Sequence, residues 1–397
     1  MRVATAERAA RVEVTTGGAV RGTVWHDALI AWLGQRIVLI ALIWLWQSLT
    51  STPTLRSIYR TGVVWDGRLY GDIARGGYHE LWQAAFYPLF PLLERALASL
   101  TGGNAEIAGL VVANAASLGV FALLRLLVAR DLGVRVARLT LVYLALFPTS
   151  MFLAAAYTEA LFLLLAVAAF VALQRERWLL AGLLAALATL TRATGLVLLL
   201  PLALTAYAAL RPRWRGLGAR ERLRAIAPVA LAALLPLVAF AALQIGLSLA
   251  YGVPGASSHA ESQFWGRSLD WPWVGLVRSA QLVAASFPST AGMDLLFALL
   301  WLALAGSMLL PRAPRLPATY IAYTWGALLL AMAAPVHTPG ESPLVSIARY
   351  MLVAFPCFVR LAQWGAASRV ARYVMLAASA GQFVALSWLF AHSRFIA

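Results

Sequence analysis

Residues 29–49 read LIAWLGQRIVLIALIWLWQSL, and this apolar stretch decides the class of fold. A helix needs about 20 apolar residues to cross a bilayer, and this segment has that length. The first 25 residues are polar and carry arginines, with no apolar core followed by a small-residue cleavage site. We therefore expect a cytoplasmic tail at 1–27, followed by an uncleaved signal anchor at 28–49.

The composition of the whole chain requires lipid around most of it. Of its 397 residues, 62% are hydrophobic and 12% are charged. Soluble domains are about 45–50% apolar and about 25% charged, so this mixture cannot make a water-facing surface. Cys357 stands alone inside an apolar segment, which excludes an intrachain disulfide and a cysteine-based zinc site.

Further apolar stretches recur along the chain and predict an all-α polytopic membrane protein. We expect about eleven transmembrane helices, in one transmembrane domain over 28–397. The apolar stretches are 28–49, 107–129, 135–148, 156–173, 178–191, 194–210, 225–250, 291–310, 318–335, 346–363 and 373–393.

The distribution of basic residues predicts the orientation. The net charge is +16, every basic residue is Arg, and about half of them fall in short loops between apolar segments. This pattern follows the positive-inside rule, not the patches that bind nucleic acid. It places the N-terminus in the cytoplasm and, with an odd helix count, the C-terminus outside. The loop arginines are Arg130, Arg135, Arg138, Arg175, Arg177, Arg211, Arg213, Arg215, Arg220, Arg222, Arg224, Arg312, Arg315, Arg360, Arg369 and Arg372.

Acidic residues gather instead in or beside the expected outer loops, of which 50–106 and 251–290 are long. The positive-inside rule does not require acids outside, so chemistry on the outer face is one cause for this asymmetry. Ten of the sixteen carboxylates belong to this set: Asp66, Asp72, Glu80, Glu94, Glu106, Glu159, Glu261, Asp270, Asp294 and Glu341. Within the first loop, we expect Phe86 to Leu100 to form an interfacial helix, with Trp82, Phe86 and Tyr87 at headgroup depth.

The segment Val64 to Tyr78 directly after the first helix carries the strongest chemical signal. A carboxylate there can accept a proton from a sugar hydroxyl, which is the basic step of glycosyl transfer. Asp66 and Asp72 are six residues apart and would lie on different faces of a helix, so a paired-carboxylate dyad is not expected. The alternative is a polar loop in which these acids simply face water.

Four motifs in order resemble the GPI mannosyltransferase 2 (PIG-V-like) family of the GT-C glycosyltransferase superfamily. The first is W-D-G-x-x-Y-x-x-I-A-x-x-G-Y from Trp65, followed by A-F-Y-P-L-F-P from Ala85. The others are F-P-T-S at Phe147 running to A-Y-T-E-A-L-F at Ala156, T-R-A-T-G-L at Thr191, and A-R-Y at Ala348. They extend over about 300 residues. Q-F-W-G-R from Gln263 is also reminiscent of the family, though less distinctly.

This resemblance implies an inverting transferase that takes mannose from polyprenyl-phosphate-mannose, with Asp66 as the general base. The pocket would lie among the outer loops, and the donor's lipid tail in a groove between helices. The short loops and the absence of Lys indicate a bacterial relative at the plasma membrane. Its acceptor would be an extracytoplasmic glycolipid or glycan. The substrate-binding residues expected from the motifs are Trp65, Arg68, Tyr70, Asp72, Tyr157, Glu159, Arg192, Gln263, Arg349 and Tyr350.

Three of these residues also have a physical argument and an alternative. Glu159 opens an apolar helix, where an ionisable group marks a functional site, although an acid also stabilises a helix N-terminus. Arg192 interrupts an apolar stretch at an outer turn, which is either a ligand contact or a simple polar turn. Arg349 can clamp a lipid-linked phosphate with its planar guanidinium, or it snorkels to the interface.

Other classes of function remain open from the sequence. His259 and His337 have no metal-ligand spacing to one another, and we expect neither a metal site nor a cofactor. A transporter of a lipid or small solute would need ionisable groups near the bilayer midplane, and no internal repeat supports it. An inactive transferase-like scaffold that assists a partner enzyme is a third possibility.

Overall fold

Helices make up the regular structure of the computed structural model, which describes residues 2–50, 52–286, 290–311 and 313–392, with side chains from residue 22 onward. The one exception in these ranges is an isolated antiparallel bridge between Arg267 and Val336. The all-α prediction is therefore confirmed.

Six helical segments of the described chain are long and apolar enough to cross a membrane. They are Gly22–Thr50 within α1 (Arg2–Thr50), α5 (Ala105–Leu132), Ala193–Leu210 comprising η4 and α9 (Leu199–Leu210), α10 (Ala219–Tyr251), α13 (Thr290–Ser307) and α17 (Arg369–Ala391). Shorter apolar helices are α7 (Thr158–Leu173), α8 (Trp178–Thr189), α12 (Val274–Ala285) and α14 (Ala318–Met332). With α6 (Val134–Ala145), the six long segments and α7, α8 and α14 fall on ten of the eleven expected apolar stretches in order, whereas α12 lies in the expected loop 251–290 and falls on none. The number of eleven spans stays a prediction.

Two expected boundaries differ in the structure. Residues 2–27, expected to be a separate tail, continue α1 as one helix. The stretch 346–363, expected to be one helix, is divided into α15 (Ile347–Leu352) and α16 (Pro356–Ala367). Pro356 opens α16, and proline cannot continue a preceding helix because it lacks the backbone N–H. In the break, Phe355 packs against Phe170 of α7 and Tyr320 of α14.

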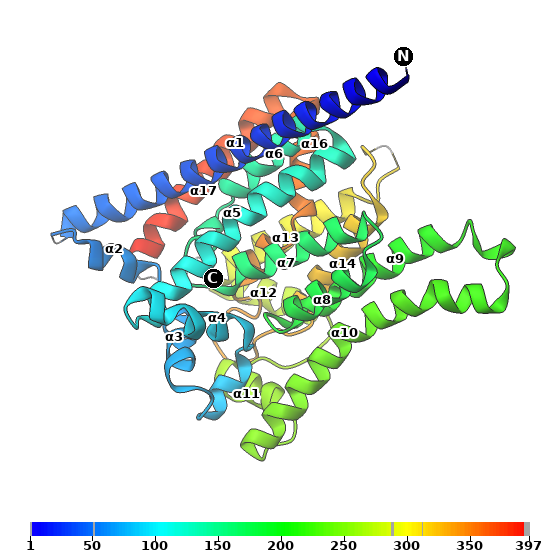
Figure 1. Cartoon of the computed structure of the whole chain (residues 1–397). Helices are drawn as coiled ribbons and strands as arrows, with labels where there is room; N and C mark the ends of the chain where they lie inside the picture. The colour runs from blue at the N-terminus through cyan, green and yellow to red at the C-terminus, as the bar shows by residue number, and fades with distance from the viewer. Residues whose placement is uncertain (1, 51, 287–289, 312, 393–397) are drawn as a thin grey trace.

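The helices form a bundle around α5, which packs against α1, α6 and α7. Figure 1 shows α1 and α17 along one edge, and α9 with α10 along the opposite edge. On that second edge, α10 packs mainly on α8. The contact is close because Gly182 has no side chain: a Cβ there would lie 2.4 Å from the carbonyl oxygen of Ala232. Small residues allow this approach between membrane helices.

Short helices gather at one end of the bundle, where the long loops return to it (Figure 1). They are α2 (Leu55–Thr61), α3 (Asp66–Gly76), α4 (Leu89–Ala98) and α11 (Ala256–Trp265). The helix expected at Phe86 to Leu100 is present as α4. Phe86 is 6% exposed and packs between the rings of Tyr70, Trp82 and Trp265, so it is a core residue of the protein and does not face lipid.

An irregular segment, residues 146–157, joins α6 to α7 and contains the 3-10 helix η3 (Ser150–Leu153). Three carbonyl groups of this segment accept hydrogen bonds from neighbouring helices. Gln35 Nε2 donates to Ser150 (2.7 Å), Arg36 Nη2 to Leu153 (2.9 Å) and Asn114 Nδ2 to Ala154 (2.9 Å). Non-helical backbone inside a membrane protein requires such internal partners. At the end of the segment, Ala156 donates its N–H to the carbonyl oxygen of Gly62 at 2.8 Å and lies against Gly67, so the start of α7 is beside α3.

Candidate active site

Asp66 is the first residue of α3, directly after a backbone in an unusual conformation. Trp65 caps this helix with φ 50° and ψ −119°, a region that non-glycine residues rarely adopt. Ser346, with φ 72°, stands in the same way before α15, the helix that carries Arg349. Two of the three non-glycine residues with positive φ in the described chain therefore precede the helices of one site. Strained backbone of this kind clusters at functional sites.

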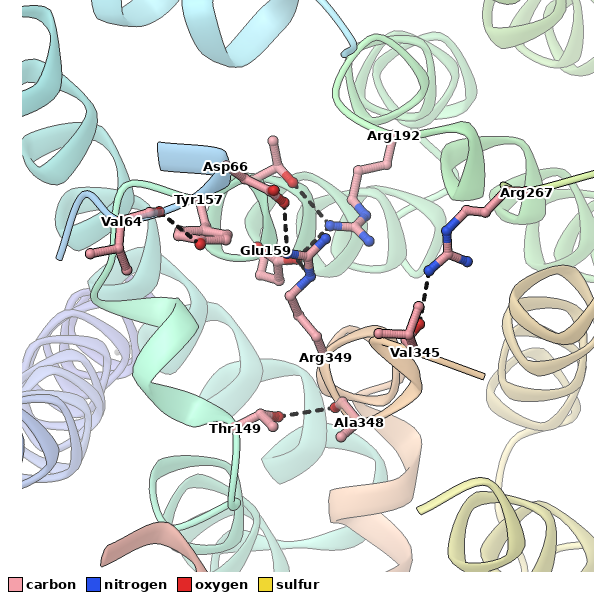
Figure 2. Close-up of polar contacts among 11 residues, drawn as sticks. Val64, Asp66, Thr149, Tyr157, Glu159, Arg192, Arg267, Val345, Ala348 and Arg349 are labelled. Atoms are coloured by element: carbon pink, nitrogen blue, oxygen red, sulfur yellow. Dashed lines mark hydrogen bonds and ion pairs between the residues drawn. The ribbon is translucent and has the colours of Figure 1, made fainter. Parts of the chain in front are cut away.

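Arg349 links the two carboxylates that the sequence singled out. Its Nη1 lies 2.7 Å from Asp66 Oδ2, and its Nε lies 3.1 Å from Glu159 Oε1. Glu159 is fully buried in the first turn of α7, where the positive end of the helix dipole favours a carboxylate. Arg192 Nη1 lies 2.5 Å from the same Oε1 and 3.0 Å from Thr158 Oγ1. Figure 2 shows these side chains converging from α3, α7, α15 and the loop before η4.

Tyr350 organises the arginines of the site. Three guanidinium groups lie over its ring, with the carbon of Arg192 at 5.1 Å, that of Arg267 at 5.4 Å and that of Arg349 at 5.7 Å from the ring centroid. Cation–π contacts of this geometry are attractive. Because arginines surround the ring, Tyr350 positions cations; it is not an open stacking surface for a sugar.

Arg267 differs from the other two arginines in its partners. Its Nη1 donates to the carbonyl oxygen of Ala334 (3.1 Å) and its Nη2 to that of Val345 (2.8 Å). Among the described residues, no carboxylate lies within ion-pair distance of Arg267, whereas Arg192 and Arg349 each have one or two. The cluster thus contains three guanidinium groups but only two carboxylates, those of Asp66 and Glu159, so positive charge is in excess.

The remaining ionisable groups around the cluster respond to this burial. Burial raises the pKa of Tyr70 above its usual range, and the nearby Asp66 raises it further. Burial also raises the pKa of Glu261 on α11, while Arg267 lowers it. The rise favours the neutral form of Glu261, so this carboxyl offsets the excess positive charge only partly. The Oε2 atom of Glu159 is buried and has no hydrogen-bond partner among the residues that the structure describes.

The tyrosine of the second motif supports the Asp66 segment. Tyr157 is 1% exposed, and its hydroxyl donates to the carbonyl oxygen of Val64 at 2.9 Å. Its ring also lies 5.5 Å below the guanidinium of Arg349. Behind the cluster, Thr149 Oγ1 donates to the carbonyl oxygen of Ala348 at 3.0 Å (Figure 2). The four motifs predicted from the sequence therefore meet at one place.

Three of the expected site residues lie apart from the cluster. Asp72 is half exposed, and its carboxylate pairs with Arg75 at 2.6 Å. Arg68 is exposed on α3, and Gln263 is exposed on α11 with no hydrogen bond to the cluster in the described part of the chain. The site residues expected from the sequence did not include Glu261 and Arg267. Arg267 is the last residue of the Q-F-W-G-R segment, and Glu261 lies two residues before that segment begins. The face of a short helix cannot be known from one five-residue motif, so the sequence did not indicate which residues of this segment lie nearest to the cluster.

A second buried carboxyl lies outside the cluster, at the contact of α4 with α5. Glu94 is fully buried, and neither of its carboxyl oxygens has a hydrogen-bond partner among the described residues. Gly109 makes room for it, since a Cβ there would lie 2.1 Å from Glu94 Oε1. Burial raises the pKa of Glu94 to about 9, so this group is protonated at neutral pH. No three His, Cys, Asp or Glu side chains of the described chain are grouped as metal ligands.

Comparison with known proteins gives one family and several relatives. Residues 50–252, about half of the chain, match the family described as Mannosyltransferase (PIG-V). Over 143 residues, the chain is 36% identical to the rat GPI alpha-1,6-mannosyltransferase 2 and 35% identical to the mouse protein. Each match covers 34% of this chain and 29% of the relative, so the matched part is less than a third of those enzymes.

Two solved structures are similar over most of the chain at low sequence identity. The ArnT structure from Cupriavidus metallidurans, bound to undecaprenyl phosphate, has a TM-score of 0.46 and 14% identity, covering 92% of this chain and 76% of that one. The Archaeoglobus fulgidus oligosaccharyltransferase has a TM-score of 0.40 and 13% identity, covering 92% of this chain and 53% of that one.

Proposed function

The chain belongs to the PIG-V mannosyltransferase family, and on this premise we propose that it is a membrane glycosyltransferase. It transfers mannose from polyprenyl-phosphate-mannose to a hydroxyl group of an extracytoplasmic acceptor, with inversion at the anomeric carbon. The observation that carries the proposal is the pairing of Asp66 with Arg349 at 2.7 Å, within a buried cluster that all four family-like motifs supply. We place the protein in the plasma membrane, with this cluster on the outer side.

Asp66 is the general base of the proposed reaction. Its carboxylate takes the proton of the acceptor hydroxyl while the hydroxyl oxygen attacks the anomeric carbon of mannose. The bond between this carbon and the phosphate oxygen breaks, and the polyprenyl phosphate leaves with the bonding electron pair. Asp66 suits the role because its side chain is 20% exposed and can meet a substrate, whereas Glu159 is fully buried.

The arginines stabilise the leaving phosphate. A lipid-linked phosphodiester carries one negative charge, which matches the excess positive charge of Arg192, Arg267 and Arg349 over the two carboxylates. Negative charge grows on the phosphate as the bond to the sugar breaks, and preorganised guanidinium groups stabilise such charge. We assign the first contact to Arg267, because it is the member of the trio without a carboxylate partner in the described chain.

The test is transfer by purified protein reconstituted in lipid, with polyprenyl-phosphate-mannose as donor and a panel of alkyl glycosides as acceptors. Asp66→Asn should abolish transfer while leaving expression intact. Asp72→Asn is the matched control, since it removes a carboxylate from the same helix but outside the cluster, and should retain activity. Transfer by the Asp66→Asn protein at the wild-type rate would remove the mechanism. A wild-type protein that transfers no sugar from this donor would remove the function.

A further inference from the structure

A second pocket lies at the opposite end of the bundle from the Asp66 cluster. The first turn of α5 lies beside α3, where a Cβ on Gly71 would be 3.0 Å from Glu106 Cγ, and Asp131 stands at the other end of α5. The 28 residues of α5 span about 40 Å, the thickness of a bilayer with its headgroups. The pocket beside Asp131 is therefore separate from the site of the proposed reaction.

The ends of α5, α7 and α14 form this pocket together with α9, and its volume is about 140 Å³. A water molecule takes up about 30 Å³ in the liquid, so the pocket has room for a group of several heavy atoms. The residues that the following argument uses are Asp131, Phe170, Gln174, Thr205, Thr319 and Tyr320.

Asp131 brings a negative charge to the pocket. Its carboxylate accepts from Gln174 Nε2 (2.7 Å to Oδ1 and 2.9 Å to Oδ2) and from the Tyr320 hydroxyl (2.7 Å to Oδ2). These donors are neutral, and no cationic side chain in the described part of the chain lies within ion-pair distance of Asp131. A carboxylate has about four acceptor positions, so Oδ1 keeps one for a ligand. A half-buried charge without a counterion favours a cationic ligand.

Two hydroxyl groups of the wall add further acceptors. Thr205 Oγ1 donates its proton to the carbonyl oxygen of Pro201 at 2.7 Å, so only its lone pairs remain for a ligand. The Thr319 hydroxyl makes no hydrogen bond with the described residues. A primary ammonium carries one positive charge and three N–H donors, which match this set of acceptors. The aromatic rings of Phe170 and Tyr320 in the wall also attract a cation.

A free cationic group stands at the edge of the pocket. Arg130 is exposed, and its Nη1 donates to Gln174 Oε1 at 3.3 Å, on the other side of the amide that binds Asp131. The remaining N–H groups of Arg130 have no partner among the described residues. Gln174 thus lies between a negative and a positive charge. This pair of charges is complementary to a zwitterion in which an ammonium and a phosphate are a few bonds apart.

We propose that the pocket binds the primary ammonium of an ethanolamine phospholipid, with the lipid phosphate at Arg130. The position at the end of membrane helices is the depth at which headgroups lie. With the Asp66 cluster on the outer side, the lipid belongs to the cytoplasmic leaflet. Binding requires no turnover, so this site is independent of the proposed transfer of mannose.

Native mass spectrometry tests the headgroup preference. Purified protein is mixed with equal amounts of ethanolamine and choline phospholipids that have the same acyl chains. The three N-methyl groups of choline remove the N–H donors and keep the charge. The wild type should retain one ethanolamine lipid with roughly tenfold preference, the size expected for charge-assisted hydrogen bonds. Equal retention of the two lipids would overturn the proposal.

Three variants locate the preference. Asp131→Asn removes the charge at constant size and should abolish the preference, whereas Thr319→Val removes an acceptor without a partner in the described chain and should reduce it roughly threefold. Glu176→Gln is the matched control, because Glu176 is an exposed acid in the turn after α7, and should keep the full preference. The ratio of two lipids is measured on folded protein alone, so a loss of stability does not change it. An undiminished preference in Asp131→Asn, or an equal loss in Glu176→Gln, would overturn the assignment.

Soluble amines separate a lipid headgroup from a free ligand of the same chemistry. O-Phosphoethanolamine has the ammonium and the phosphate without acyl chains, and should displace the retained lipid. Putrescine has the ammonium alone, and should need a concentration roughly tenfold higher because the contact of a phosphate with Arg130 is missing. If putrescine displaced the lipid at a lower concentration than O-phosphoethanolamine, the pocket would be a site for a soluble amine and the lipid assignment would be wrong.

Discussion

Arg349 Nη1 lies 2.7 Å from Asp66 Oδ2, although 283 residues separate them along the chain. The pair joins the first loop after α1 to the short helix α15, and Glu159 and Arg192 extend it to α7 and the turn before η4. The side chains of Asp66 and Arg349 are 20% and 11% exposed, so solvent screens the pair only in part. The ion pairs thus connect four elements of the chain.

Arg349→Lys should reduce kcat roughly hundredfold, the scale seen when one preorganised donor to a developing anion is removed. Lysine keeps the charge, but it cannot hold Asp66 and Glu159 at once with a planar fork. The measurement is kcat and KM for the donor, with the melting temperature as a control for folding. A kcat equal to that of wild type would show that the contact with Asp66 is structural.

Arg267→Gln should raise the KM for the donor roughly tenfold, because a charge-assisted contact with the phosphate is lost. Arg278→Gln is the matched control: Arg278 is an exposed arginine on the neighbouring helix α12, hydrogen-bonded to His337. The steady-state KM of both variants is measured at two salt concentrations. If both variants changed the KM equally, the effect would come from general surface charge and the assignment of Arg267 would be wrong.

Glu94→Gln should make the protein more stable than the wild type, by a margin that grows as the pH rises. Folding raises the pKa of Glu94 from its ordinary value of 4.5 to about 9, so between these pH values the unfolded state binds fewer protons than the folded state. The stability of the wild type therefore falls as pH rises through this window, and at pH 7 the glutamine variant gains at most roughly 3 kcal/mol. Melting temperatures of both proteins from pH 4 to pH 9 test this. They should converge at the acidic end, and parallel curves throughout would contradict the prediction.

Gly182→Val should separate α8 from α10. Even a Cβ at this position would lie 2.4 Å from the carbonyl oxygen of Ala232, so we expect a loss of roughly 2 kcal/mol from overpacking. Gly246→Val is the control on α10, since a Cβ there meets nothing within 4 Å. Thermal unfolding in detergent compares the two variants. Equal melting temperatures would mean that the two helices are not closely packed in solution.

Much of the helical order could be predicted from the sequence, because each long apolar run has to become a helix in lipid. The break between α15 and α16 escaped this reasoning, although Pro356 was a visible signal that one helix could not continue. Hydropathy counts apolar residues and does not weigh a single proline. The continuation of α1 to Arg2 was also not predicted, because polar residues can form a helix without any apolar pattern in the sequence.

The site was predictable as a set of residues but not as a geometry. The motifs named Asp66, Glu159, Arg192 and Arg349, and the structure brings these four together. No pattern in the sequence showed that Arg349 would bridge two carboxylates, because that contact depends on tertiary packing. Gln263 was chosen where Glu261 and Arg267 lie nearer to the charges, since the rotation of α11 about its axis is set by the loops around it.

The bonds from Gln35 and Arg36 to the carbonyl groups of residues 150–153 also bear on how the protein is made. When residues 146–157 leave the ribosome and enter the bilayer, their unpaired peptide groups need partners that lipid does not offer. The first helix, synthesised earlier, already carries those partners. Without α1, the carbonyl groups of Ser150 and Leu153 would lose these two donors, so the folding of the later segment depends on the earlier helix.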